Sequence, residues 1–524
     1  KNGAGILTRN GVNTATGPFA VNAGRLRVDG TLGSLVNVAN GAVLMGTGTV
    51  GGFAVASGGR VSPGPGIGTL SSTGNVSIAG GGIYAVDVTS TGQSDRIAVT
   101  GNATLSPGAQ IIVTKTDAPR HVLGTRYTVL TTTGALTGSF AVSGDTRVST
   151  FINVVGATDA RNAYLDVRQT RSFASAAGTP NQIAAATGVD NSGNGNLYTA
   201  IAYLQTDAEA RAAFDQVSGE VHASARGATL QDSRFVREAI SHHFLASGEP
   251  TSSLWAHAYG SWGRTQSDGN AARVQRDIGG FFIGGDILAS DTVKLGVLAG
   301  YGAAEIKVPD RNSNVSTDDI HLAAYAGIKS GNFMATLALA HAWRNIDSRR
   351  TVSFTGFQDS LTASYQTRMF QAFAEAAYTI DAGPVGIEPF AQAAFVDIST
   401  AAFAETGGAA RLSAGKTSDD FIVTTLGARV KAGLPMGDGS FGVVGEVGWR
   451  HTGNGNVNTP MGLGFGAGPV FTVAGPPIAR DAAALGLTIS GSIGSNAEVE
   501  FGYSGQVGDG FNDHGVKAGF LLRF

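Results

Sequence analysis

The stretch AEVEFGYS at residues 497–504 alternates strictly between apolar and polar or small side chains. In a β-strand successive side chains point to opposite sides, so Val499, Phe501 and Tyr503 share one face and the residues between them the other. The stretch VKAGFLLRF at residues 516–524 repeats the pattern. Such alternation predicts strands that turn one face toward an apolar environment and the other toward a polar one.

The same period of two runs through residues 254–524, where twelve runs of about ten residues can be counted. Some connections are tight, as at residues 289–292 and 329–332. Other connections are long and polar, at residues 265–277, 345–361, 402–419 and 452–480. Short turns at one end and long loops at the other are typical of a membrane β-barrel with an apolar outside and a polar inside. A large antiparallel sandwich with one wet face is the soluble alternative.

The composition of the 524 residues agrees with this interpretation: 77 are Gly, 42 % are hydrophobic, 14 % are charged, none is Cys and the net charge is −3. This charge balance argues against a nucleic-acid binder that acts through phosphates. The lack of Cys excludes a disulfide or thiolate–metal scaffold. No run of 18 apolar residues occurs, so strands are the remaining way to span a membrane. All four Trp lie in residues 254–524, as expected for side chains that gather at membrane interfaces.

A short motif recurs in residues 1–170, with spacings of 17, 23 and 27 residues. Its copies are ANGAVL at 39–44, ASGGRV at 56–61, AGGGIY at 79–84 and SPGAQI at 106–111. A turn followed by a short strand, repeated about every 20 residues, predicts stacked coils of a parallel β-helix. A generic all-β sandwich is the alternative. We expect residues 1–82 to form the coils and residues 83–170, whose strands are longer, to cap the exposed end of the stack.

Residues 171–253 form a predicted helical linker, because Ala-rich helical patterns replace the strand patterns there. These patterns cover residues 197–205, 208–216 and 221–245. In the helix of 221–245, His222, Arg226 and Arg237 lie within about 60° of one another. This basic stripe is either a solvated face or, if the helix fills the barrel, a face that meets acids of the lumen.

The period of two places five acids on the polar, inward face of the barrel strands: Glu375, Glu388, Glu446, Glu498 and Glu500. If the helix of 221–245 occupies the lumen, Arg226 and Arg237 are predicted to pair with some of these acids. Desolvation of both charges opposes the gain from such pairs.

Several stretches resemble the type Va autotransporters of Gram-negative bacteria. In the barrel region they are LWAHAYGSWG at 254–263, DGNAAR at 268–273, FTVAGPPIAR at 471–480 and KAGFLLRF at 517–524. GEVHAS at 219–224 is similar to the family's segment before the barrel. KNGAGILT at 1–8 with VNAGRL at 21–26 is similar to the passenger-associated strand repeat, and SPGPGIG at 62–68 and SDRIAV at 94–99 to the junction region.

The resemblance implies an all-β fold with a helical linker: a right-handed parallel β-helix, then an α-helix plugging a 12-stranded antiparallel transmembrane β-barrel. It implies that the barrel of residues 254–524 lies in the outer membrane and exports the β-helical passenger, which stays on the cell surface or is released. The pore helix is expected at about 221–245.

The resemblance also implies partners. These are the outer-membrane barrel-assembly machinery, periplasmic chaperones, lipid or lipopolysaccharide, and host or surface ligands of the passenger. It implies a monomeric barrel and no nucleic acid. Phe520, Leu522 and Phe524 match the family's C-terminal assembly signal, and they also form the outward face of the closing strand.

No catalytic motif is found: the chain has no His-Glu-x-x-His, no Gly-x-Ser-x-Gly and no Walker loop. His242 and His243 adjoin on a helix and point about 100° apart, which makes them a poor metal pair. We therefore predict no catalytic residue, no metal and no cofactor. Some relatives cleave their own linker at an Asn-Asn pair in the pore helix, whereas residues 221–245 contain no Asn. The isolated Asp87 and Asp95 are interpreted as turn or strand-end residues.

Two hypotheses about function remain. The first is a type V secretion translocator with a passenger stalk. The second is a surface adhesin, virulence factor or enzyme whose active part lies upstream of residue 1, or a porin-like channel. A porin has no need of a β-helical segment of 170 residues and a plugging helix, and an enzyme should show polar catalytic clusters. The sequence therefore favours the translocator.

Overall fold

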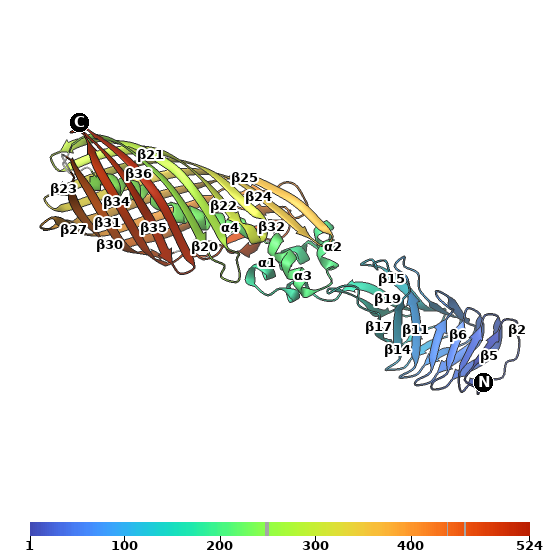
Figure 1. Cartoon of the computed structure of the whole chain (residues 1–524). Helices are drawn as coiled ribbons and strands as arrows, with labels where there is room; N and C mark the ends of the chain where they lie inside the picture. Colours follow the sequence, from blue (N-terminus) through green and yellow to red (C-terminus); the bar gives the residue numbers. More distant parts are fainter. Residues whose placement is uncertain (247–250, 437–438, 455–456) are drawn as a thin grey trace. The chain divides into compact units, whose positions relative to one another are not determined.

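The computed structural model describes residues 1–246, 251–436, 439–454 and 457–524, and the side chains of these residues outside 434–440. The chain divides into two units (Figure 1), Lys1–Ser172 with Ala202–Thr206 and Phe173–Ile201 with Asp207–Phe524. None of the helices in the described ranges is long and apolar enough to cross a bilayer.

The first unit is built mainly from parallel strands in two sheets. One sheet has the order β1 (Ile6–Arg9), β4 (Arg25–Val28), β6 (Val43–Gly46), β8 (Arg60–Pro63), β11 (Ile83–Val88), β14 (Gln110–Lys115) and β17 (Ala141–Gly144). The other has the order β16 (Leu136–Thr137), β13 (Ala103–Leu105), β10 (Val76–Ile78), β7 (Thr49–Val55), β9 (Thr69–Ser72), β12 (Arg96–Val99), β15 (Arg126–Thr132), β19 (Asn162–Gln169) and β18 (Ile152–Thr158). Strand β5 (Thr31–Val38) joins it through β7 and also pairs with β2 (Val12–Asn13) and β3 (Phe19–Val21).

The spacing of the sequence motif is the spacing of the coils. Val43 pairs with Arg60, Arg60 with Ile83, and Ile83 with Gln110, so paired residues lie 17, 23 and 27 positions apart. The third residue of each motif copy is a Gly with positive φ: Gly41 (75°), Gly58 (73°), Gly81 (79°) and Gly108 (88°). A side chain is strained in this left-handed conformation, so Gly is required at this corner of each coil. The predicted parallel β-helix is confirmed.

One apolar ladder forms the centre of this stack. Leu26, Leu44, Val61, Tyr84 and Ile111 are register partners on consecutive strands, and each is at most 1 % exposed. Burial of side chains of this kind stabilises by about 1.5–3 kcal/mol each. The hydroxyl of Tyr84 donates to the carbonyl of Val129 at 2.7 Å, which satisfies its only polar group. The parallel order ends at β19, which pairs antiparallel with β15 and β18.

The helices are η1 (Phe173–Ala176), α1 (Pro180–Ser192), α2 (Asn196–Ala202), α3 (Asp207–Val217), α4 (Glu220–Asp232), α5 (Arg234–Ala246) and η2 (Pro309–Arg311). The prediction of one helix over residues 221–245 is wrong in one respect, because the helix is divided at Ser233. The backbone N–H of Ser233 is shared between the carbonyls of Thr229 and Leu230, at 3.2 Å each. Helix α1 was not predicted.

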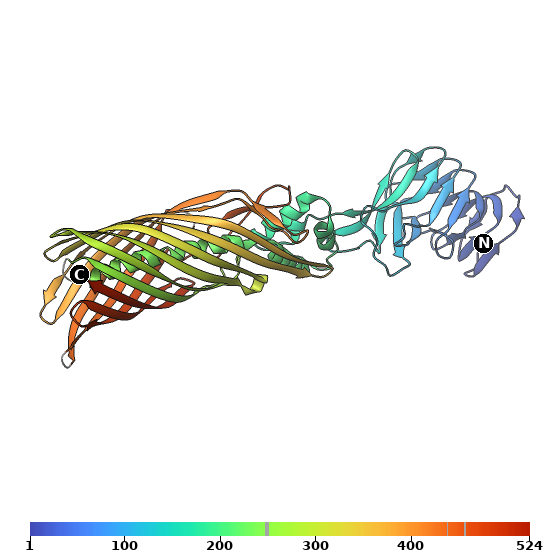
Figure 2. The ribbon, with the colours of Figure 1, turned by 90° about the horizontal axis from the view of Figure 1, so that it is seen from above.

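The second unit contains a closed antiparallel barrel of twelve strands in the described residues (Figures 1 and 2). They are β20 (Ser253–Thr265), β21 (Val274–Ser290), β22 (Val293–Val308), β23 (Ser313–Ser330), β24 (Phe333–Phe354), β25 (Phe357–Tyr378), β27 (Val385–Thr400), β30 (Thr417–Met436), β31 (Gly439–Gly453), β34 (Asp481–Ile493), β35 (Ala497–Gly508) and β36 (Phe511–Arg523). Strand β36 pairs with β20 along its whole length and closes the ring. The short β26 (Ile380–Ala382) pairs with β27 in the turn after β25. The predicted 12-stranded barrel is confirmed.

The predicted long loop at residues 345–361 is wrong, because β24 and β25 continue through it to a tight turn. The period of two persists there, but its outward residues Asn345, Asp347 and Arg349 are polar, so the apolar alternation that marks a membrane strand is lost. Two other predicted loops hold a small sheet in the order β28 (Phe403–Ala404), β29 (Leu412–Ala414), β32 (Met461–Phe465) and β33 (Phe471–Val473).

The apolar face of the barrel points outward. Large apolar side chains such as Val297 (64 % exposed) and Phe501 (68 %) stand on it. Trp262 and Trp449 also face outward, as expected for interface residues. Trp255 does not: it is buried, stacks 4.9 Å from the ring of His243 and donates through Nε1 to the hydroxyl of Tyr325 at 2.7 Å. Counting every Trp of the barrel as an interface residue therefore overestimates the number of Trp side chains at the membrane interface.

Asp95 makes the stability of the first unit dependent on pH. Its two carboxylate oxygens accept the N–H groups of Gly68 (2.8 Å) and Asp87 (3.0 Å), and the side chain is buried. This burial raises the pKa of Asp95 to about 7, whereas an unfolded Asp has a pKa of about 3.9. Between these values the folded unit binds more protons than the unfolded one, so its stability falls as the pH rises from about 4 to 7.

We expect the melting temperature of this unit, followed by far-UV circular dichroism of the full chain in detergent, to fall between pH 5 and pH 7.5. Asp95→Asn, which cannot ionise, should flatten that slope, while a substitution of the exposed Asp145 to Asn should keep it. An unchanged slope in Asp95→Asn would show that another group causes the dependence.

Candidate functional site

Helices α4 and α5 run through the interior of the barrel (Figure 2). All residues of α4 except Gln231 are buried, as are ten of the thirteen residues of α5. The buried residues include Arg, His, Asp and Ser, so these helices are not apolar core helices. A polar helix can be buried in this way only if the wall around it supplies hydrogen-bond and charge partners.

The three predicted basic residues all contact the inner wall. The Nε2 of His222 lies 2.9 Å from Glu405, and its Nδ1 lies 2.9 Å from the hydroxyl of Tyr365. Arg226 donates to the hydroxyl of Thr400 at 2.7 Å and forms an ion pair with Asp419. Arg237 donates to Gln371 and to the hydroxyl of Ser233.

The predicted pairs between these arginines and the five lumen acids do not form. Glu375, Glu388 and Glu446 bind Arg429 of β30, at 2.7, 3.3 and 2.7 Å. Glu498 pairs with Arg523, and Glu500 lies 3.6 Å from His257. The prediction was wrong because Glu388 and Glu446 are direct cross-strand neighbours of Arg429 in the barrel wall. Neighbours in register meet without the helix. Within the part of the chain that the structure describes, Glu375 is the only one of these five acids with a direct hydrogen bond from the helices, which the hydroxyl of Ser241 donates at 2.8 Å.

One set of ion pairs between helix and wall was not predicted. Asp232, the last residue of α4, forms ion pairs with Arg276 of β21 and with Arg344 of β24, the latter at 2.9 Å. Arg344 also binds Asp319, with an Nε distance of 2.8 Å, and Arg276 also binds Asp513. We call the following residues the central ion cluster: Asp232, Arg234, Arg276, Asp319, Arg344 and Asp513.

The side chains of this cluster are buried, and their formal charges sum to zero. It contains three Arg and three Asp, and none of them is more than 4 % exposed. Arg234, the first residue of α5, reaches Asp513 at 3.1 Å, so both sides of the helix break contribute. Removal of one member leaves a buried charge without its counter-ion, which typically costs about 3–5 kcal/mol.

A signal for the cluster was present in the sequence. In the alternating pattern of their strands, Arg276 and Arg344 stand at positions whose side chains point inward. Asp232 lies in the helix that was expected to enter the lumen. A search for inward cations that match helix acids would have found them. The prediction considered only helix cations and wall acids.

A second polar group closes the long-loop end of the lumen. Glu405 receives a bidentate pair from Arg350, with distances of 2.6 and 2.8 Å, besides its contact with His222. At the start of α4, Glu220 accepts the N–H of Ala272 at 2.7 Å and lies 3.0 Å from Arg311. The beginning of the helix is thus fixed to the residues that follow β20 and β22.

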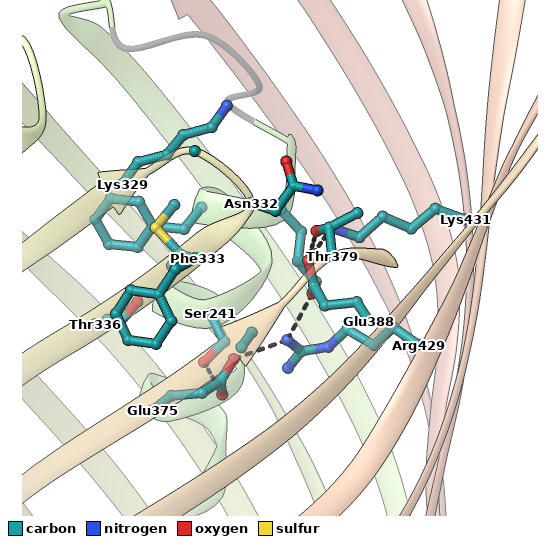
Figure 3. Close-up of a pocket in the computed structure, with 15 residues that line it drawn as sticks. Ser241, Lys329, Asn332, Phe333, Thr336, Glu375, Thr379, Glu388, Arg429 and Lys431 are labelled. Atoms are coloured by element: carbon teal, nitrogen blue, oxygen red, sulfur yellow. Dashed lines mark hydrogen bonds and ion pairs between the residues drawn. The ribbon is translucent and has the colours of Figure 1, made fainter. Parts of the chain in front are cut away.

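The short-turn end of the lumen is less completely filled. A cavity of about 220 Å³ lies there between the end of α5 and the wall (Figure 3). Glu375 lies between Ser241 and Arg429, and Glu388 links Arg429 to Lys431 and to the hydroxyl of Thr379, at 2.9 Å from the latter. The wall side chains therefore close the part of the cross-section that α5 leaves open.

The described residues contain no group of three or more His, Cys, Asp or Glu side chains placed to hold a metal ion. The residues of the predicted assembly signal, Phe520, Leu522 and Phe524, lie on the outward face or end of β36 and are 43 %, 36 % and 73 % exposed.

A closed barrel with an apolar outside, a polar lumen, and a lumen filled by the segment that precedes the first strand defines a plugged transmembrane transport barrel. Residues 254–504 match the family model for the autotransporter beta-domain. The chain therefore carries an autotransporter β-domain, an outer-membrane β-barrel.

Two curated relatives from Serratia marcescens, both called extracellular serine protease, match all of this chain with 30 % and 28 % identity. The matches cover 55 % and 56 % of those proteins, so the chain spans about half of their length. Among solved structures, the translocator domain of the autotransporter NalP from Neisseria meningitidis is 16 % identical, with a TM-score of 0.48, and the match covers 58 % of this chain and 99 % of that one. The transport unit of AIDA-I from Escherichia coli is 17 % identical, with a TM-score of 0.43 and coverages of 53 % and 92 %.

Neutralising the helix acid of the central ion cluster should loosen the helices. Asp232→Asn keeps the size of the side chain but leaves Arg276 and Arg344 with an excess positive charge, so we expect the free energy of unfolding to fall by about 3 kcal/mol. Denaturant unfolding of the refolded full chain in detergent measures this change. Asp310→Asn, at an exposed position in η2, is the matched control and should stay within about 0.5 kcal/mol of the unsubstituted chain. Equal stability of the two variants would contradict the role assigned to Asp232.

Proposed function

We propose that this chain is a type V secretion translocator that exports and displays its own N-terminal β-helical segment. The observation that carries the proposal is the path of the chain through the barrel. Residues just before α4 lie at the long-loop end, where Arg350 donates to the carbonyl of Gln216 at 3.1 Å. The end of α5 lies at the other end, where Arg523 donates to the carbonyl of Ala246 at 2.7 Å.

In outer-membrane barrels the short turns face the periplasm and the long loops face outward. With that orientation, everything that precedes α4 continues from the outer side of the membrane, while β20 starts at the periplasmic side. A chain that threads its own lumen in this direction is what a completed export event leaves behind. The central ion cluster and the Glu405 group then hold the helices in place as a plug.

The proposal extends to the neighbouring parts of the chain. Residues 83–170, in which the parallel stack ends in antiparallel pairs, act as the cap of the exported stack. The barrel-assembly machinery recognises the exposed side chains at the end of the closing strand, which are Phe520, Leu522 and Phe524. Periplasmic chaperones hold the chain before insertion, and the barrel works as a monomer.

A second candidate concerns the exported cargo. Because two extracellular serine proteases align with the whole of this chain, we propose that the β-helical segment is the stalk of an exported serine protease whose catalytic part lies outside residues 1–524. A serine-directed covalent probe applied to the full-length gene product on intact cells should label it. Loss of labelling after deletion of the upstream part would locate the catalytic serine there, and labelling within residues 1–524 would contradict the assignment.

Export can be tested on living cells. When intact cells are treated with a protease, we expect residues 1–172 to be cut while the barrel, detected by an antibody to its C-terminal part, stays whole. Cells with a permeabilised outer membrane serve as the control for periplasmic exposure. Protection of residues 1–172 in intact cells, with cleavage only after permeabilisation, would reject export and favour the porin-like alternative.

A further inference from the structure

The outward face of the barrel carries an apolar groove that crosses strands β20 to β25. Its volume is about 640 Å³. Small residues form its floor, among them Gly285, Ala299 and Ala324, while exposed Leu322 and Leu339 stand on its sides. A second groove of about 520 Å³ continues it toward β25 and β27 and shares Ala324 and Leu339 with the first. Together they make one continuous apolar depression on the outward face.

The residues of β24 show how this groove lies in the membrane. Outward residues are apolar from Phe333 to Leu339, and beyond Trp343 they are polar, beginning with Asn345 and Asp347. The eleven residues from Phe333 to Trp343 are separated by ten steps, which rise by about 25 Å if the strand tilts by about 40° and so match the apolar band of outer-membrane barrels. The groove is therefore in the hydrocarbon layer, and its upper end reaches the interface on the long-loop side.

An exposed cation stands at that upper end, on the same outward face as Asp397, which is the register partner of Phe370. Arg368 of β25 is exposed, is the register partner of Trp343, and lies two residues beyond Phe370, which lines the groove. Its Nε donates to the side chain of Gln366 at 3.1 Å, and no carboxylate of the described residues pairs with it. His341, which also lines the groove, packs its ring 4.4 Å from that of Trp343.

We propose that this groove binds one lipopolysaccharide molecule of the outer leaflet, with an acyl chain along the alanine floor and a phosphate of the lipid A head group on Arg368. Lipid tails surround the groove, so an acyl chain gains only dispersion contacts by entering it. The selectivity for one lipid therefore depends on the polar residues at the upper end of the groove, here called the rim, and above all on Arg368. A guanidinium binds phosphate through two parallel N–H bonds, and the long-loop side faces the leaflet that contains this phosphorylated glycolipid. The inference depends on the orientation of the barrel in the outer membrane and not on export.

The test is native mass spectrometry of the full chain in detergent, with bis-phosphorylated lipid A, dephosphorylated lipid A and phosphatidylglycerol offered at equal concentration. We expect one bound lipid A per chain and about tenfold weaker retention of the dephosphorylated form, because one charge-assisted contact is lost. Phosphatidylglycerol, which carries a phosphate but a different head group and only two acyl chains, should also be retained more weakly.

Two variants separate the rim from the floor. Arg368→Gln should lower lipid A binding to the level of the dephosphorylated lipid, and Ala324→Leu, which fills the floor, should lower binding of both forms. Arg264→Gln is the matched control, because Arg264 is an exposed outward cation beside Trp262 on β20, away from the groove. Heat-modifiable migration on gels verifies that each variant has a folded barrel. Equal retention of the three lipids, no effect of Arg368→Gln, or dimers that form without lipid would each overturn the proposal, the last in favour of a second copy on this face.

Discussion

A charged helix can lie inside a membrane barrel only where the wall supplies a partner for its charges, because a buried charge without a counter-ion costs several kcal/mol. In this chain the requirement is concentrated at Asp232, which two wall arginines from different strands bind at once. Each of these arginines is in turn bound to a wall aspartate, Asp319 or Asp513. The break at Ser233 places Asp232 and Arg234 on either side of it, so α4 and α5 are held by one network.

The ends of the lumen use the same principle with different residues. At the long-loop end Glu405 joins His222 of the helix to Arg350 of the wall. At the short-turn end most charges are paired within the wall around Arg429, and a cavity remains beside α5. The second half of α5 is nevertheless tied to the wall, because His243 pairs with Asp286 and Lys517 donates to the ring of His242. The two helices are therefore held to the wall along their whole length.

The sequence was sufficient to predict elements whose pattern is local. The motif spacing of 17, 23 and 27 residues is the coil register, and the period of two gave the twelve barrel strands. The prediction was wrong where a strand continues outside the membrane. Residues 345–361 belong to strands, but their outward side chains are polar because they lie beyond the apolar band. Partner choice inside the lumen could not be read from parity. The alternation of side chains along each strand shows that Glu388 and Arg429 both point into the lumen. Only the strand register shows that these two residues are neighbours and pair with each other. Arg226 therefore pairs with Asp419 instead.

The matching of helix and wall is tested most directly by the ionic conductance of the purified full chain in planar lipid bilayers. If α4 and α5 fill the lumen and are held there by their ion pairs, we expect the unsubstituted barrel to stay closed. Removal of residues 221–246 should open a stable channel, and Asp232→Asn should produce intermittent openings. A permanently open pore in the unsubstituted chain, with the same conductance after removal of the helices, would contradict the claim that the helices close the barrel.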